Sequence, residues 1–244
     1  MSVIKSNHGG LGGSGAPGGA LGSFYSHTID QSLKIDDASG GYLTISSASP
    51  TATNRKKVTI SCWVKRAGSG SGVNTVFWAD GAGLMLQFFA ADSIYIYDNG
   101  AGGYQAYVQP SAGVSRLFRD FSAWYHLALI IDTTQSTEAD RSKFYINGTL
   151  NAQSSYPGQN TDINWHTGSA MRIGSVGDSQ DLAGYIAEFI SIDGQDVSIS
   201  DLGETKDGVW VPKNVSGLTL GNAGFYLKFD NSSDIGNDSG SNNI

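Results

Sequence analysis

Nucleophilic chemistry in this chain would depend on Cys62, because the sequence contains a single cysteine. A catalytic thiol needs a positioned histidine. His126 lies inside a strand-like pattern, whereas His8, His27 and His166 lie in polar or Gly-rich segments. Cys62 sits in an apolar alternation typical of a small buried side chain, and it cannot form an intrachain disulfide. The histidines also lack the paired local spacing of zinc ligands, so we assign no catalytic residue and no zinc site.

The charge balance argues against a nucleic-acid partner. The chain has 244 residues, a net charge of −7 and a pI near 4.9, whereas phosphate binding needs clustered Lys and Arg. The only basic run, residues 55–57, precedes an expected strand, where solvated charges are ordinary; contact with a phosphate or a sulfated glycan is the alternative. No stretch reaches about 18 apolar residues, and the N-terminus lacks an apolar signal core. We therefore expect synthesis and folding in a cytoplasm, without membrane insertion.

Short apolar runs separated by turn residues dominate from Phe24 onward, and helical periodicity is hard to find. Hydrophobic residues make up 39% of the chain and aromatic residues 11%, which is ample for a core. This pattern predicts an all-β fold. The expected strands are residues 32–35, 42–45, 58–65, 75–78, 84–89, 93–97, 125–132, 143–147, 171–174, 184–192, 208–213 and 224–230.

Two of these strands are expected to be neighbours. Residues 125–132 are nearly continuously apolar, as befits a central strand covered on both faces. Residues 143–147 end at Asn147-Gly148, the strongest short hairpin signal in the chain. We expect the two strands to pair across residues 133–142.

The first 25 residues differ from the rest, because residues 8–22 are rich in glycine and cannot bury a core by themselves. We expect an N-terminal arm over residues 1–25, a β-sandwich over residues 26–230 and a polar tail over residues 231–244. A neighbouring subunit would hold such an arm, and a tail folded back on its own domain is the alternative. The candidate assembly contacts are Leu11, Leu21, Phe24 and Tyr25.

The order of four segments resembles a known fold. The segment from Trp124 to Asp132, the strand ending in Asn147-Gly148, Met171-Arg-Ile-Gly174 and Gly184-Tyr-Ile-Ala-Glu-Phe-Ile-Ser-Ile192 follow one another as in the laminin-G/pentraxin/concanavalin A-like sandwich. The resemblance implies a two-sheet antiparallel, jelly-roll sandwich. A fold of this kind has many functions, so it does not by itself specify one.

Three C-terminal segments sharpen the resemblance. Gly208-Val-Trp-Val-Pro-Lys213, Gly224-Phe-Tyr-Leu227 and Ile235-Gly-Asn-Asp-Ser-Gly-Ser-Asn242 are similar to the concanavalin A-like domains of tailed-bacteriophage structural proteins. Together with the earlier segments they span roughly residues 32–243. The resemblance implies a non-enzymatic virion surface protein, such as a capsid decoration, cement or head-fibre protein. It would attach to other virion subunits through its N-terminal arm. We expect it to form a homo-oligomer or to be bound to a lattice. A tail-fibre protein that binds host surface glycans is the alternative.

Glucanases share this sandwich, so an enzymatic role has to be weighed. Their retaining chemistry uses two carboxyl groups on alternate positions of one strand, as Glu-x-Asp-x-Glu, and that spacing is absent. The nearest pair is Glu188 and Asp193, which are five residues apart and therefore point to opposite faces of a strand. We expect no hydrolase activity.

Lectin-like sandwiches bind sugars through loop Asp, Asn and aromatic residues, often with Ca²⁺. Residues 80–83, 98–104 and 178–181 are the loops rich enough in oxygen, although tight turns require the same residue types. The aromatic candidates, among them Tyr107 and Trp210, suit a subunit contact equally well. The candidate calcium ligands are Asp98, Asp178 and Asp181. The candidate glycan contacts are Asp98, Asn99, Tyr104 and Trp165. No cofactor other than Ca²⁺ is expected.

Overall fold

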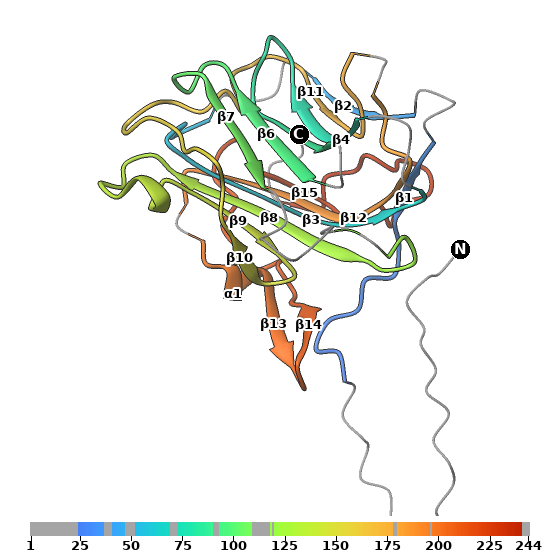
Figure 1. Cartoon of the computed structure of the whole chain (residues 1–244). Coiled ribbons are helices and arrows are strands. Elements are labelled where there is room, and N and C mark those ends of the chain that lie inside the picture. Colours follow the sequence, from blue (N-terminus) through green and yellow to red (C-terminus); the bar gives the residue numbers. More distant parts are fainter. Residues whose placement is uncertain are drawn as a thin grey trace, which may run out of the picture.

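The computed structural model of the protein describes residues 24–36, 41–46, 52–68, 73–89, 93–108, 118, 120–177, 180–195 and 197–240. Within these residues, two antiparallel sheets pack face to face (Figure 1). The seven-stranded sheet has the order β1 (Leu33–Ile35), β12 (Gly184–Asp193), β3 (Lys57–Arg66), β8 (Tyr125–Asp132), β9 (Ser142–Ile146) and β10 (Thr149–Asn151), with β15 (Phe225–Leu227) paired to β12. The six-stranded sheet has the order β2 (Leu43–Ile45), β11 (Met171–Ile173), β4 (Asn74–Ala79), β5 (Met85–Phe89), β6 (Ser93–Asp98) and β7 (Tyr104–Val108). The predicted two-sheet antiparallel sandwich is confirmed.

The core lies between the two sheets and follows from strand alternation. In β3, Val58 and Val64 are buried in the main core, whereas Trp63 points to the other side and packs against Ile29. Aromatic rings fill the centre of the core, where Phe189 stacks on Phe225 with ring centroids 5.8 Å apart. Such pairs add stability beyond the area that they bury.

The predicted pairing of the two central strands is confirmed. β8 pairs with β9 in antiparallel register, with Leu127 opposite Ile146. The Asn147-Gly148 turn then leads into β10, and both turn residues have positive φ, 48° and 74°. These two values are typical of the tight hairpin turn that Asn-Gly favours.

Three strands are absent from the sequence prediction, residues 104–108, 149–151 and 203–206, and the first of these contributes to the six-stranded sheet. Residues 104–108 form β7 and pair with β6 in antiparallel register. The sequence alone places Tyr104 in a loop and Tyr107 among the aromatic contact residues. The glycines just before it, Gly102 and Gly103, have φ of 71° and 74° and make the turn between the two strands. This strand was not predicted because it is short and directly follows a Gly-rich turn.

The outer surface of the seven-stranded sheet is largely covered by other parts of the chain, and we call it the covered face. Helix α1 (Ile199–Leu202) and the hairpin of β13 (Gly203–Lys206) and β14 (Val209–Pro212) extend from the far side of this sheet (Figure 1). Leu202, Val215 and Leu220 pack there on Ile190 of β12. The packing of these segments creates a second hydrophobic cluster outside the main core.

Both ends of the described chain are tied to the sandwich. At the N-terminal end, His27 bonds to Glu188 of β12 at 2.6 Å. At the C-terminal end, the amide of Tyr226 donates to the Asp238 carboxylate at 2.9 Å, and the amide of Ser239 donates to the Tyr226 carbonyl at 2.7 Å. Asp238 and Ser239, which lie beyond the expected 26–230 sandwich, therefore contact it.

Candidate functional site

The outer surface of the six-stranded sheet carries a group of half-buried aromatic side chains. Alternation along β6 sends Ile94 and Ile96 into the core and leaves the tyrosines between and beyond them on the outside. The same alternation in β4, β5 and β7 supplies the other members. We call this surface the aromatic face; its members are Trp78, Met85, Phe89, Tyr95, Tyr97 and Tyr107.

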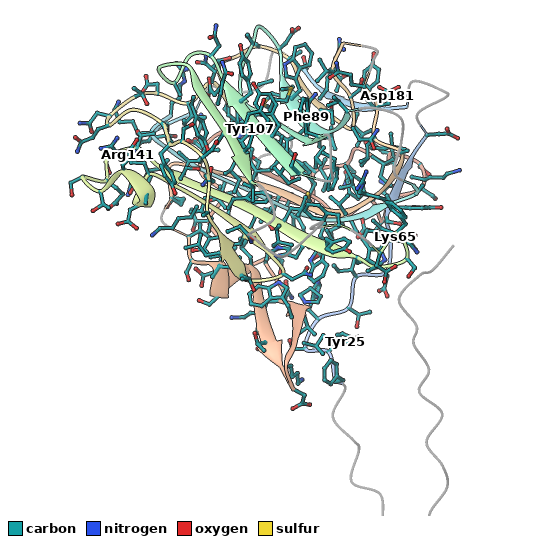
Figure 2. The ribbon with its side chains drawn as sticks, viewed as in Figure 1. Tyr25, Lys65, Phe89, Tyr107, Arg141 and Asp181 are labelled. Carbon is teal, nitrogen blue, oxygen red and sulfur yellow. The ribbon has the colours of Figure 1, made fainter. Side chains whose placement is uncertain are left out.

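The rings of the aromatic face contact one another across three strands. Tyr95 stacks on Tyr107 with centroids 4.8 Å apart and an interplanar angle of 29°. Phe89 lies 5.7 Å from Tyr95 and 5.8 Å from Tyr107, and Tyr97 lies 6.1 Å from Tyr95. Figure 2 shows Phe89 and Tyr107 near each other on the six-stranded sheet, far from Tyr25. These side chains thus form a continuous apolar platform.

The strand register extends this platform sideways. Tyr97 lies opposite Met85, Met85 opposite Trp78, and Trp78 opposite Arg172 of β11. The guanidinium carbon of Arg172 lies 5.5 Å from the centroid of the Trp78 ring and 4.9 Å from that of Tyr42. A cross-strand row therefore runs from β6 to β11 and ends in a cation held between two aromatic rings.

Amides lie among the aromatic side chains. Gln87 donates to the hydroxyl of Thr75 at 2.9 Å and to the side-chain carbonyl of Gln180 at 2.8 Å. The hydroxyl of Tyr95 donates to Gln105 at 3.2 Å, and partial burial, followed by the neighbouring tyrosines, raises the pKa of Tyr95. The phenol is therefore neutral at physiological pH, and the face presents flat rings with neutral hydrogen-bonding groups.

The loop residues predicted to bind a glycan are mostly inside the protein, and this part of the prediction is wrong. Asp98 is fully buried and accepts hydrogen bonds from the amides of Gly100 and Asn164, at 2.9 and 2.7 Å, and of Ala101, at 3.3 Å. Burial raises the pKa of Asp98 while these amides lower it. Its carboxylate fixes the turn after β6 and a distant loop, so it cannot contact a sugar in solution.

The two aromatic glycan candidates are buried as well. Tyr104 is 3% exposed, and its hydroxyl bonds to Ser142 at 2.9 Å and to Gln153. Trp165 is 0% exposed and donates its indole hydrogen to Ser191 at 2.8 Å. Of the four predicted contacts, Asn99 is exposed. The polar ends of these side chains satisfy internal partners, not external ones.

Two of the three predicted calcium ligands, Asp98 and Asp181, are also buried. Asp98 is occupied by backbone amides, Asp181 is 7% exposed, and Asp178 lies outside the described residues. Among the residues that the structure describes, no three His, Cys, Asp or Glu side chains come together as a metal-binding group. The described geometry thus provides no cluster on which to build a calcium site.

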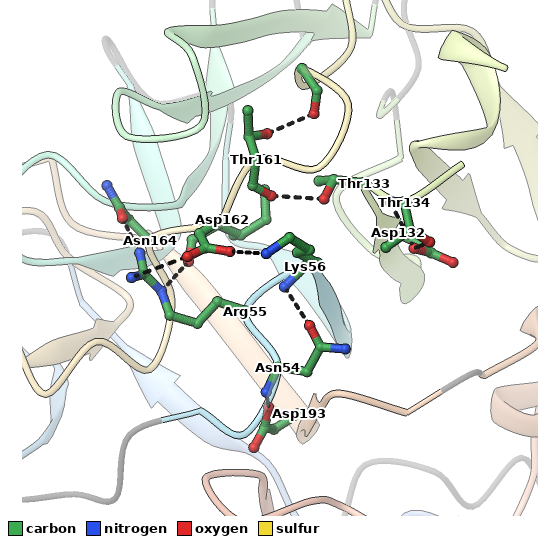
Figure 3. Close-up of polar contacts among 12 residues, drawn as sticks. Asn54, Arg55, Lys56, Asp132, Thr133, Thr134, Thr161, Asp162, Asn164 and Asp193 are labelled. Carbon is green, nitrogen blue, oxygen red and sulfur yellow. Dashed lines mark hydrogen bonds and ion pairs between the residues drawn. The ribbon is translucent and has the colours of Figure 1, made fainter. Parts of the chain in front are cut away.

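The basic run is neutralised by carboxylates at one end of the sandwich (Figure 3). Lys56 bonds to Asp162 at 2.9 Å, and Arg55 lies 3.9 Å from the same carboxylate and donates to the carbonyl of Ile163 at 3.0 Å. Lys57 lies 3.6 Å from Asp132. These ion pairs favour a structural role for the run over contact with an anionic ligand.

A polar hollow of about 340 Å³ lies beside β8 and β9 on the covered face. Its polar side chains already have partners. Lys143 lies 3.0 Å from Asp140, and the amide of Gln135 donates to Asp132 at 2.7 Å. The hollow therefore offers fewer free groups than the aromatic face.

The described part of the expected assembly contacts lies near the β13–β14 hairpin. Phe24 is 37% exposed, and its ring lies 5.0 Å from that of Tyr25 and 5.7 Å from the Lys206 ammonium. Leu11 and Leu21 lie outside the described residues. No partner chain is present, so the assembly role of these residues stays a prediction.

The carboxylates weighed for catalysis have separate partners. Glu188 lies at a β-bulge in β12 with a φ of 47°, and it accepts hydrogen bonds from Tyr226 at 2.5 Å and contacts His27. Asp193 accepts from the amides of Thr53, at 2.7 Å, and of other loop residues. Glu188 is 8% exposed, so its carboxylate is largely shielded from solvent.

Cys62 is buried as predicted, and burial raises the pKa of its thiol, which makes a thiolate unfavourable. His126 is 1% exposed and bonds to Ser61 at 2.8 Å and to the indole of Trp210 at 3.1 Å. This histidine holds the β13–β14 hairpin on the covered face.

The fold and the aromatic face together define a lectin-like β-sandwich. The family model of the concanavalin A-like lectin/glucanases superfamily, Laminin_G_3, matches residues 37–195. The chain belongs to this family. Among curated proteins, none matches the sequence.

Solved structures share the fold at low identity. A candidate carbohydrate binding protein from Bacteroides ovatus ATCC 8483 is similar with a TM-score of 0.54 and 19% identity, over 82% of this chain and 52% of that protein. This chain thus spans about half the length of that relative. A heptameric SAP-like pentraxin from Limulus polyphemus has a TM-score of 0.46 and 11% identity, over 65% of this chain and 71% of that one. Domains LG4-5 of the mouse laminin α1 chain have a TM-score of 0.44 and 13% identity, over 67% of this chain and 41% of that one.

Proposed function

We propose that the protein is a non-enzymatic carbohydrate-binding domain that binds its ligand on the aromatic face. The observation that carries the proposal is the contiguous group of half-buried rings around the Tyr95–Tyr107 stack. Large apolar patches that stay open on a folded protein mark binding sites. Membership of the lectin/glucanase family supports a carbohydrate as the ligand.

The chemistry of the face suits a sugar. A pyranose ring has a face of C–H groups, which carry a small positive charge, and an aromatic ring has a negative face. The exposed amide of Gln105 lies beside the rings, and an amide can both donate to and accept from hydroxyl groups. A site of this kind combines stacking with hydrogen bonds that set orientation.

Two tyrosine variants test this function. Tyr95→Ala and Tyr107→Ala should weaken binding to a glycan retained by the wild-type protein on a glycan array by about tenfold or more, because each removes a central stacking surface. Tyr185→Ala is the matched control, since Tyr185 is a half-buried tyrosine of β12, in the other sheet, and packs 6.4 Å from Trp124. Equal binding by all three variants and the wild type, or no retained glycan, would reject the proposal.

The cellular setting that we propose is the surface of a tailed-bacteriophage virion. The similarity of residues 208–213, 224–227 and 235–242 to phage structural proteins supports it, as does the exposure of Phe24 where the described chain begins. Capsid decoration or a head fibre is the preferred role, with attachment through the first 25 residues; a tail-fibre receptor-binding protein is the second. Deleting residues 2–22 should leave the melting temperature unchanged and abolish incorporation into particles. Normal incorporation of the truncated protein would contradict attachment through the arm.

A further inference from the structure

We infer that the ligand of the aromatic face is an internal stretch of a linear, uncharged polysaccharide, not a single terminal sugar. This inference rests on the proposed function and adds the length and the charge of the ligand. It depends on how far the face extends, on its shape and on its charge.

The first step is the extent of the face. Gln105 of β7 lies opposite Tyr97, so the cross-strand row extends from β7 over β6, β5 and β4 to β11. The four strand spacings amount to about 19 Å. Aromatic or thioether side chains occupy the row on β6, β5 and β4, at Tyr97, Met85 and Trp78. One sugar ring can stack on one aromatic side chain, so a single residue of the ligand would leave most of this surface uncovered. A chain of several sugars would cover it.

The second step is the shape of the site. Recognition of a terminal sugar requires a concave pocket that surrounds its hydroxyl groups. The members of the aromatic face come from neighbouring strands, not from loops, and Tyr95 and Tyr107 stack with an interplanar angle of 29°. The row crosses five neighbouring strands and is built from strand residues, namely Gln105, Tyr97, Met85, Trp78 and Arg172. Such a site lies across a sheet surface and does not enclose a chain end, so it suits a segment within a polymer.

The third step is charge. The outward positions of the described strands β4 to β7 carry aromatic, thioether, hydroxyl and amide groups, such as Met85, Gln87 and Gln105, and Asp98 at the end of β6 is fully buried. Arg172, at the far end of the row, holds its cation against Trp78 and Tyr42. The protein as a whole has a net charge of −7, which repels polyanions. Outward positions that carry no carboxylate in the described strands β4 to β7, on an acidic protein, fit an uncharged glycan best.

Affinity electrophoresis and calorimetry with defined probes test the inference. Gels containing mixed-linkage β-glucan, glucomannan or pullulan, which are neutral and unbranched, are compared with gels containing polygalacturonate or hyaluronate. At least one neutral polymer should retard the wild-type protein, and neither acidic polymer should. For the neutral polymer that binds, its own oligosaccharides from the monosaccharide to the hexasaccharide are then titrated. The affinity should rise by about tenfold or more from disaccharide to hexasaccharide, and the monosaccharide should not compete.

Variants at Trp78, which lies in the row away from the Tyr95–Tyr107 stack, make the test specific. Trp78→Ala should lower the affinity for the hexasaccharide while leaving that for the trisaccharide within about twofold, because a short ligand can stay on the Tyr95–Tyr107 stack. Trp78→Leu, which keeps a larger apolar side chain on β4, provides the same readout if Trp78→Ala does not fold. Equal affinity for the monosaccharide and the hexasaccharide, or retardation by the acidic polymers alone, would overturn the inference and leave the proposed function in place. Loss of all glycan binding, or binding that Tyr95→Ala does not change, would reject the proposed function itself.

Discussion

The outer surfaces of the two sheets have similar side chains but differ in what lies over them. On the seven-stranded sheet, Trp63 is 9% exposed because Ile29 and other residues pack against it, and His126 is 1% exposed. On the six-stranded sheet, Tyr95, Tyr97 and Tyr107 remain half-buried. The covered face completes the fold of the chain, whereas the aromatic face is the surface on which we propose that the ligand binds.

The hydrogen bonds of the two faces support the same distinction. The indole of Trp210 donates to His126, and the hydroxyl of Tyr226 donates to Glu188. In contrast, the Tyr95 hydroxyl, on the aromatic face, bonds to an exposed side chain, that of Gln105. The polar groups of Trp210 and Tyr226 on the covered face are thus bonded to buried partners. On the aromatic face, we propose that the Tyr95 hydroxyl can replace its hydrogen bond to Gln105 with one to a ligand.

The largest expected difference between the faces is in stability. Trp210→Ala should lower the free energy of unfolding by about 3 kcal/mol, because it removes a packed ring and leaves the Nδ1 acceptor of His126 without its donor. Tyr97→Ala on the aromatic face should cost less than about 1 kcal/mol. Urea unfolding of both variants measures the difference. A cost for Tyr97→Ala as large as that for Trp210→Ala would mean that the aromatic face also stabilises the fold.

Acid should weaken the covered face next. Burial lowers the pKa of His126 from its usual 6.5 to about 3, and burial is also the main reason why the pKa of His166, in the interior, falls to about 4. The unfolded chain takes up protons below pH 6.5 that the folded chain does not, so stability is lost as the pH falls from about 6.5 towards those values. At about pH 5, His126 alone should account for roughly 2 kcal/mol.

The His126→Gln variant isolates this effect. Its free energy of unfolding should change less between about pH 7 and pH 5 than that of the wild type, by roughly 2 kcal/mol, while the part due to His166 persists. Urea titrations at the two pH values provide the comparison. An unchanged pH dependence in this variant would show that His126 is protonated in the folded state.

A smaller effect is expected where the N-terminal segment meets the covered face. His27→Ala removes the 2.6 Å contact with Glu188 and should cost about 1 kcal/mol. Amide hydrogen exchange should increase in residues 24–31 and in the β13–β14 hairpin, with little change in β5 to β7. Uniform exchange across both sheets would indicate that the segment stabilises the whole sandwich and not only its cover.

The strand pattern and the main pairing could be predicted because their signals are local. Alternation of Val58, Ile60, Cys62 and Val64 specifies the inward side of β3, and Asn147-Gly148 specifies its own turn. The covered face could not be predicted in this way. Its contacts, such as that between His27 and Glu188, join residues 161 positions apart in the sequence.

The candidate glycan site failed for a different reason. Asp98 in a turn has the same sequence appearance whether its carboxylate binds a ligand or three backbone amides, and only the three-dimensional structure separates the two. Trp165 looked exposed because it lies in a polar loop, yet it fills the core beside Phe77, at 5.3 Å. A useful signal was nevertheless present, since Tyr95 and Tyr97 occupy alternate positions of a predicted strand whose other positions are isoleucine.

The most direct test of the aromatic face uses the methyl groups of methionine. Met85 is half-buried between Trp78 and Tyr97 on this face, whereas Met171 is 1% exposed in the core and serves as an internal control. In a methyl-labelled sample titrated with a neutral oligosaccharide that binds, the Met85 resonance should shift with saturation and the Met171 resonance should stay in place. Saturable binding that leaves Met85 unshifted would place the ligand elsewhere on the protein and contradict the account.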